Sequence, residues 1–170
     1  MKSILLFGFL ALIAVIGLIQ LIPVDRSNPP VESDIPTSPE VKANLRRACY
    51  DCHSHETVWP WYSQVAPISW LLAQDVHEGR EEINFSTWNR YSTKEQVKKL
   101  KESWQEVAEG EMPPWFYLLP HRRARLSPQD RVRLRAWALA PLDAEASTGE
   151  RLEKHERDDD PSRSTEGERQ

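Results

Sequence analysis

Two cysteines and a histidine form the stretch of this chain with the most chemical content, Cys49-Tyr50-Asp51-Cys52-His53. Two thiols three positions apart, followed directly by an imidazole, have the C-x-x-C-H spacing at which one haem can be captured. Both sulfurs then form thioethers with haem vinyl groups, and the histidine binds the iron. The motif therefore predicts one covalently attached haem c, with Cys49 and Cys52 as attachment points and His53 as the proximal iron ligand.

Other uses of two cysteines can be compared with this one, because Cys49 and Cys52 are the only cysteines in the chain. A structural zinc site commonly needs a second Cys or His pair at similar spacing, which the sequence lacks. A disulfide between residues three apart closes too short a loop to stabilise much. A thioredoxin-like dithiol remains an alternative, although it belongs in a β-α-β pattern that is not seen here.

Met112 is the expected distal iron ligand. Apart from the initiator it is the only methionine, and it lies in Gly110-Glu111-Met112-Pro113-Pro114, just after the strongest predicted helix. A residue before proline favours extended backbone, so Met112 is expected on a stiffened loop. A thioether is a soft ligand that suits haem iron. The alternative is a methionine that fills a gap in the core.

His121 is the alternative distal ligand, because it follows Met112 on the same predicted loop. The adjacent Arg122 and Arg123 are expected to meet water or haem propionates, for which guanidinium groups are well suited. The other three histidines are expected to take no part at the iron. His55 is too close to His53, His77 lies near a helix end, and His155 lies in the charged tail.

Four helices are expected to position these residues. They begin at Ser38-Pro39, Pro67, Ser92 and Ser127, and they end near Ala48, at Gly79, at Gly110 and before Pro141. Apolar residues at helical spacing should face the core: Val41, Leu45 and Ala48; Ile68, Leu71, Leu72 and Val76; Val97, Leu100, Trp104, Val107 and Ala108; Leu134, Trp137 and Ala138. Lys42, Asn44, Arg46 and Arg47 should face water.

No segment has a convincing strand pattern. The aromatic run Trp59-Pro60-Trp61-Tyr62 is expected to form a loop that could lie across the haem edge. The seven tryptophans all lie between Trp59 and Trp137, which is typical of a dense aromatic core or of the wall of a flat cofactor.

The amino-terminal stretch from Ile4 to Ile22 is apolar apart from Gln20 and is long enough to cross a membrane. Lys2 at its front favours a cytoplasmic amino end, with everything after Val24 exported. No A-x-A cleavage pattern follows, which favours an uncleaved anchor. We therefore expect a single-pass protein of the inner membrane with its domain on the periplasmic side, where covalent haem attachment takes place in bacteria.

The chain is expected to divide into a transmembrane signal-anchor (1–24), a Pro-rich linker (25–38), a haem-binding domain (39–142) and a charged, disordered tail (143–170). The linker, with its closely spaced prolines, should be an extended tether that holds the domain off the membrane. The tail holds ten acidic and five basic residues, so the rest of the chain is nearly neutral although the net charge is −4. This balance favours no nucleic-acid partner.

Together these segments resemble the single-haem, cytochrome c-like haem-binding domain proteins that are anchored in bacterial envelopes. The resemblance rests on CYDCHSHETVWPWYSQVAPISW, EGREEINFSTW and GEMPPWFYLLPH, within residues 40–140. It implies an all-α fold, a small cytochrome c-like helical domain around one covalent haem c. It also implies haem binding by Cys49, Cys52 and His53, with Met112 as the distal ligand.

The expected function is one-electron transfer between redox partner proteins of the envelope, and not enzymatic catalysis, because two protein ligands leave no open position on the iron. Two alternatives remain open. One is a haem-based peroxidase or a gas or redox sensor, in which Met112 is absent from the iron or easily displaced. His121 or Arg122 could then assist peroxide chemistry. The other is a haem-free thiol oxidoreductase that uses the two cysteines.

Overall fold

The computed structural model describes residues 2–142, and this part of the chain is helical with no strand. A single isolated parallel bridge joins Ser33 to Thr87. The expected all-α class is therefore confirmed. The helices are α1 Lys2–Ile19, α2 Pro39–Ala48, α3 Tyr50–His53, α4 Ile68–Glu82, α5 Thr93–Glu109 and α6 Trp115–Leu118, with 3-10 turns η1 Trp61–Gln64, η2 Trp88–Arg90 and η3 Arg122–Ala124; a further helix covers residues 128–142.

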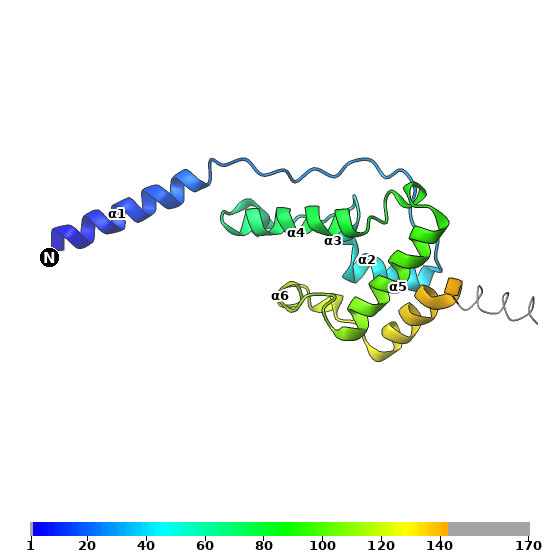
Figure 1. Cartoon of the computed structure of the whole chain (residues 1–170). Coiled ribbons are helices and arrows are strands. Elements are labelled where there is room, and N and C mark those ends of the chain that lie inside the picture. Colours follow the sequence, from blue (N-terminus) through cyan, green and yellow to red (C-terminus); the bar gives the residue numbers. More distant parts are fainter. Residues whose placement is uncertain (1, 143–170) are drawn as a thin grey trace, which may run out of the picture.

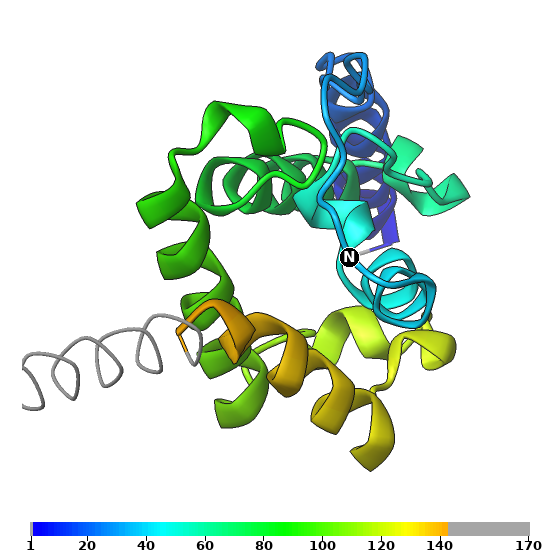
Figure 2. The ribbon, with the colours of Figure 1, turned by 90° about the vertical axis from the view of Figure 1, so that its right-hand side faces the viewer.

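Helix α1 stands apart from the other helices, and an extended segment leads from it along the domain (Figure 1). None of its residues is buried, and it is long and apolar enough to cross a membrane. Seen along the perpendicular direction, α2, α3, α4, α5, α6 and the 128–142 helix surround a common axis (Figure 2).

Helix α2 forms as the sequence predicts. The Ser38 hydroxyl accepts a hydrogen bond from the Val41 N–H, and the predicted face of Val41, Leu45 and Ala48 is buried. Val41 and Leu45 of this face belong to a core shared with the linker, α3, the segment after α4, η2, α5 and the 128–142 helix. Its members are Ile35, Val41, Leu45, Tyr50, Ile83, Phe85, Trp88, Leu100, Leu134 and Ala138.

The prediction that Asn44 faces water is wrong, because Asn44 is only 4% exposed. The reason is that α2 is covered on a second side. Arg47 reaches across this side, where its Nη2 donates to Asn44 at 3.3 Å and to Asp130 of the 128–142 helix at 2.9 Å.

Helix α4 differs most from its prediction. It continues past Gly79 to Glu82, so Gly79 is not its C-cap. Of the four apolar residues predicted to face the core, only Val76 is buried, while Ile68 and Leu71 are exposed. Gly79 is instead a point of close contact with α3, because a Cβ there would lie 2.7 Å from the Cys52 carbonyl oxygen.

Helix α5 confirms its predicted ends. Ser92 and Glu95 form a capping box, and Gly110 ends the helix in the left-handed conformation at φ 89°. Leu100 and Val107 are buried, whereas Ala108, at the edge of the predicted stripe, is exposed.

The last helix begins at Ser127, whose hydroxyl accepts a hydrogen bond from the Asp130 N–H at 3.2 Å. Leu134 and Ala138 are buried as predicted. The prediction that it stops before Pro141 is wrong, because the described helix continues to residue 142. Ala138, three residues before Pro141, is 2% exposed, so the helix is packed in the core close to the proline.

The Pro-rich segment is extended, as expected, but it does not stand free of the domain. Ile35 is 2% exposed and belongs to the core. Its N–H donates to the Phe85 carbonyl at 3.1 Å, and Glu32 N and Ser33 N both donate to the Ser86 carbonyl. The expectation of a spacer is therefore wrong for this segment, because its backbone groups find partners on the domain.

Candidate haem-binding site

The five motif residues form one helical turn that follows directly on α2. Cys49 N donates to the Leu45 carbonyl at 2.8 Å, and His53 N donates to the Cys49 carbonyl at 2.9 Å. Because the turn is continuous with a buried helix, the two thiols and the imidazole are presented from a fixed backbone. The three groups lie close together because they share one helical turn.

The His53 ring has a defined orientation and tautomer. Its Nδ1 lies 2.7 Å from the Gly79 carbonyl oxygen and 3.3 Å from that of Ile83. A carbonyl can only accept, so Nδ1 must carry the proton and Nε2 keeps its lone pair. Burial lowers the pKa of His53, which favours this neutral form. A neutral imidazole with one committed nitrogen is the arrangement found in metal-binding histidines.

Gly79 makes this orientation possible. Helix α4 crosses α3 so closely that Gly79 has no room for a side chain. The same close approach brings the Gly79 carbonyl to the His53 ring. Phe85 supports the ring from another direction, with ring centroids 6.2 Å apart, and its N–H donates to the His53 carbonyl at 2.8 Å.

Both cysteines are free of disulfide bonding. Burial raises the pKa of the Cys49 thiol and of the Cys52 thiol to about 12. Redox-active dithiols need a lowered pKa to form the thiolate, so this environment argues against the thiol oxidoreductase reading.

Asp51, between the two cysteines, ties the motif to two other segments. Its carboxylate accepts hydrogen bonds from the Tyr117 hydroxyl at 2.7 Å and from the Val58 N–H at 3.0 Å. Burial, and then the bond to Asp51, raise the pKa of Tyr117, which therefore stays a protonated donor. Helix α6 is thus fastened to the motif at one point.

The loop after the motif carries buried donors without a protein partner. Within residues 2–142, the Trp59 indole N–H and the Tyr62 hydroxyl have none. Trp61 points outward and is exposed.

Met112 lies where the sequence predicts, on a short loop fixed to the end of α5. Gly110 N, Glu111 N and Met112 N all donate to the Glu106 carbonyl, at 3.2, 3.0 and 3.1 Å. The Met112 residue is 36% exposed. Among the described residues no hydrogen bond joins Met112 to the motif, so its ligation of iron stays a prediction.

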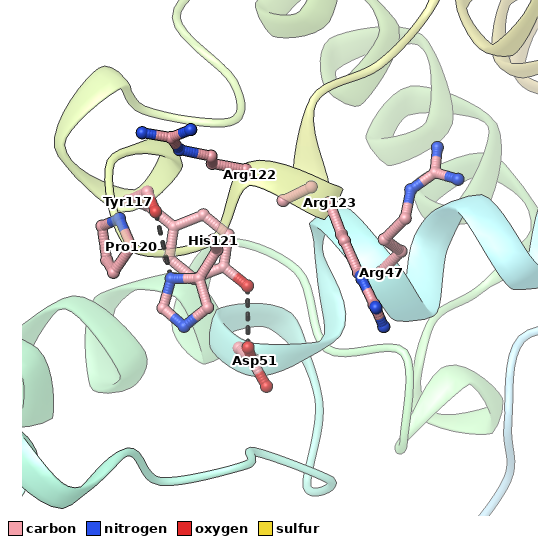
Figure 3. A pocket seen from close by; sticks show the side chains of 8 residues that line it. Arg47, Asp51, Tyr117, Pro120, His121, Arg122 and Arg123 are labelled. Carbon is pink, nitrogen blue, oxygen red and sulfur yellow. Dashed lines mark hydrogen bonds between the residues drawn. The ribbon is translucent and has the colours of Figure 1, made fainter.

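His121 lies close to the motif through its neighbour Tyr117. Its ring stacks on the Tyr117 ring at 4.1 Å, and its Nδ1 donates to the Tyr117 carbonyl at 3.0 Å. Both residues line a cavity of about 430 Å³ beside Asp51 (Figure 3). Arg47, Arg122 and Arg123 also line this cavity. Their predicted contact with haem propionates stays a prediction.

Two other histidines have ordinary structural partners. His55 Nδ1 donates to the Pro30 carbonyl at 2.9 Å, and its Nε2 accepts from the Asn84 amide at 2.8 Å. His77 is exposed, and its Nε2 lies 3.3 Å from a carboxylate oxygen of Glu81. His155 lies outside the described residues.

The donor set fits a haem. Two thiols outside any disulfide and one neutral imidazole come from a single turn. The imidazole Nε2, which has no hydrogen-bond partner within residues 2–142, is the nitrogen that can bind iron. A helical domain with this set is a haem protein by class, and the comparison with protein families agrees.

The family described as haem-binding domain matches residues 14–140, and the chain belongs to this family. No curated protein and no solved structure matches the chain.

Sequence reasoning missed three contributors to this site: Gly79, Asp51 and Tyr117. Gly79 had a signal, since a glycine inside a longer helical pattern suggests a close approach, but it was interpreted as a helix end. The bond between Asp51 and Tyr117 had no sequence signal, because it joins residues far apart in the chain.

Proposed function

We propose that the protein is a membrane-anchored, c-type haem protein that transfers single electrons in the bacterial envelope and is not an enzyme. The observation that carries this proposal is the hydrogen bond from His53 Nδ1 to the Gly79 carbonyl, within a C-x-x-C-H turn. It leaves Nε2 as the only nitrogen of the ring able to bind iron. Haem, when bound, supplies an iron that can gain and lose one electron.

The chain's own residues hold and orient that group. Cys49 and Cys52 would attach it covalently, and His53 would bind the iron. Met112, whose loop is fixed by three hydrogen bonds to one carbonyl, would supply the second protein ligand. A His/Met ligand pair raises the reduction potential of the haem compared with two nitrogen ligands.

The anchor and its orientation are part of the proposal. Helix α1 is apolar and wholly exposed, and Lys2 stands at its amino end. Lys2 would keep that end in the cytoplasm, so that the haem domain would lie on the periplasmic side of the inner membrane. Envelope redox proteins would be the partners.

A haem stain of the full-length protein on a denaturing gel tests covalent attachment. We expect the wild-type band to retain haem and the Cys49→Ala plus Cys52→Ala variant to lose it. His53→Ala should keep stainable haem but change its absorption spectrum. A wild-type protein that reacts fully with a thiol reagent and carries no haem would support a dithiol protein instead.

The oxidised spectrum separates an electron carrier from an enzyme or sensor. We expect a low-spin spectrum with the weak far-red band of sulfur-ligated ferric haem. A resting high-spin spectrum would favour the peroxidase or sensor alternative, in which Met112 is off the iron.

A further inference from the structure

A cluster of exposed apolar side chains lies on η1, on the start of α4 and on the loops around them. We call it the apolar patch, and it consists of Val58, Trp61, Val65, Ile68 and Leu71. Three of these residues are among the most exposed apolar residues outside α1: Trp61 at 77%, Val58 at 75% and Leu71 at 62%. Large apolar side chains left exposed close together in one segment favour contact with a membrane or a partner.

The patch lies in a stretch of sequence without charge. From Thr57 to Gln74, eighteen consecutive residues include no Asp, Glu, Lys, Arg or His, although 28% of the chain's residues are charged. Charges resume on both sides, at Glu56 and Asp75. A face in water has no need to exclude charge, whereas a face in contact with hydrocarbon does.

Hydrogen bonds fasten the patch to the end of the apolar helix α1. The Gln20 side chain, one residue after α1, donates to the Ala66 carbonyl at 3.2 Å and accepts from the Ala66 N–H at 2.9 Å. Arg26 Nη1 donates to the Ser63 carbonyl at 3.1 Å. Figure 1 shows the start of α4 at the end of the domain nearest α1.

We propose that the apolar patch rests in the interface of the bilayer that α1 crosses, and that Gln20 holds it there. This inference rests on the proposed membrane anchor. A membrane, and not a partner protein, is favoured because the patch is fixed within the same chain to the point where α1 would leave the hydrocarbon. Tryptophan side chains favour that depth, and Trp61 is the most exposed residue of the patch.

This contact would fix the haem domain against the membrane. Arg80 strengthens the connection, because its guanidinium donates to Ser27, Asn28, Ser54 and Thr57 and so joins the linker to the motif segment and α4. A domain held in this way presents a constant face to partners in the same membrane.

Photo-crosslinking of the full-length holoprotein in nanodiscs of phosphatidylethanolamine and phosphatidylglycerol tests the proposal. Three variants carry the photoreactive residue: Trp61→p-benzoylphenylalanine in the patch, Leu10→p-benzoylphenylalanine in α1, and Val132→p-benzoylphenylalanine. Val132 is the matched control, because it is 68% exposed on the 128–142 helix. Mass spectrometry identifies lipid adducts, and haem absorption shows that each variant has folded. If the Trp61 variant lacks haem, Leu71→p-benzoylphenylalanine replaces it.

We expect lipid adducts from positions 10 and 61 and none from position 132. Adducts from position 10 alone would overturn the proposal, as would a crosslink from position 61 to a second protein chain. Absence of adducts from position 10 would overturn the anchor and the patch together, while the haem stain would still report independently on haem attachment.

The Gln20→Leu variant tests the connection itself, because leucine cannot make either bond to Ala66. We expect the adduct from position 61 to fall while that from position 10 is retained. An unchanged yield at position 61 would overturn the role assigned to Gln20.

Discussion

The Nδ1 atom of His53 prepares the ring for binding a metal through Nε2. The hydrogen bond from Nδ1 to the Gly79 carbonyl fixes the tautomer, and burial keeps the ring neutral. The motif alone predicts His53 as an iron ligand. The carbonyl that orients it comes from α4 and depends on a glycine.

Changing Gly79 to alanine tests this arrangement. The new Cβ would lie 2.7 Å from the Cys52 carbonyl oxygen, so α3 and α4 must move apart. Overpacking of this kind costs about 1–3 kcal/mol, and we expect the holoprotein to unfold at a lower temperature. Gly17→Ala is the control, because nothing lies within 4 Å of that position. Equal melting temperatures for both variants would show that the close approach does not matter.

Replacing Met112 with alanine tests the distal ligand. We expect the haem to stay attached, the reduction potential to fall and the far-red band to disappear, because a sulfur ligand is removed. A redox titration with parallel spectra measures both effects, and His121→Ala is the matched control. The assignment would be wrong if His121→Ala changed these properties and Met112→Ala did not.

At the scale of elements, a polar network joins the linker to α2 and α3. Asp34 accepts hydrogen bonds from Lys42 at 2.6 Å and from the Tyr50 hydroxyl at 2.5 Å. Lys42 also donates to the Ile35 carbonyl at 2.8 Å. The linker therefore takes part in positioning the helix that leads into the motif.

This network predicts a pH dependence. Burial raises the pKa of Asp34, but hydrogen bonds from Lys42 and Tyr50 outweigh it and hold that pKa below its usual 3.8. The carboxylate therefore stabilises the fold above pH 3.8, and this contribution is lost as the pH falls through the lower folded pKa. We expect Asp34→Asn to destabilise the protein at neutral pH and to differ less from wild type in acid. Thermal unfolding across this range is the measurement, and a difference independent of pH would contradict it.

Helix starts were the most predictable part of the fold, whereas the predicted ends at Gly79 and before Pro141 were wrong. Contacts between elements were the least predictable. Ser38, Ser92 and Gly110 could be assigned from sequence because a cap depends on residues within one turn. The burial of Asn44 and the exposure of Leu71 could not, because each depends on which distant segment covers that face. For the site, the motif and the Met112 loop were visible in the sequence, whereas the Asp51–Tyr117 bond was not.

The whole molecule consists of an apolar helix, a docked linker and a helical domain around the motif. The sequence indicated these parts, but it predicted a free tether. The hydrogen bonds of Gln20, Arg26 and Arg80 to residues 54–66 or to the linker show why that prediction failed. Polar side chains in this segment, which from the sequence were interpreted as typical of a linker, instead form hydrogen bonds that attach the segment to the domain.

Removal of residues 143–170 should leave haem binding intact, because this polar stretch has no apolar periodicity with which to join a core. The measurement is the haem content of a chain that ends at residue 142, compared with the full chain. Loss of haem in the shorter chain would show that the segment takes part in folding or attachment.

The most direct test of the central claim is the intact mass of the full-length protein, matured in bacteria that attach haem c, after extraction with acid and organic solvent. We predict a mass greater than that of the polypeptide by one haem, together with a reduced absorption spectrum typical of a c-type cytochrome. A mass equal to that of the bare polypeptide, with both Cys49 and Cys52 open to alkylation, would contradict the account.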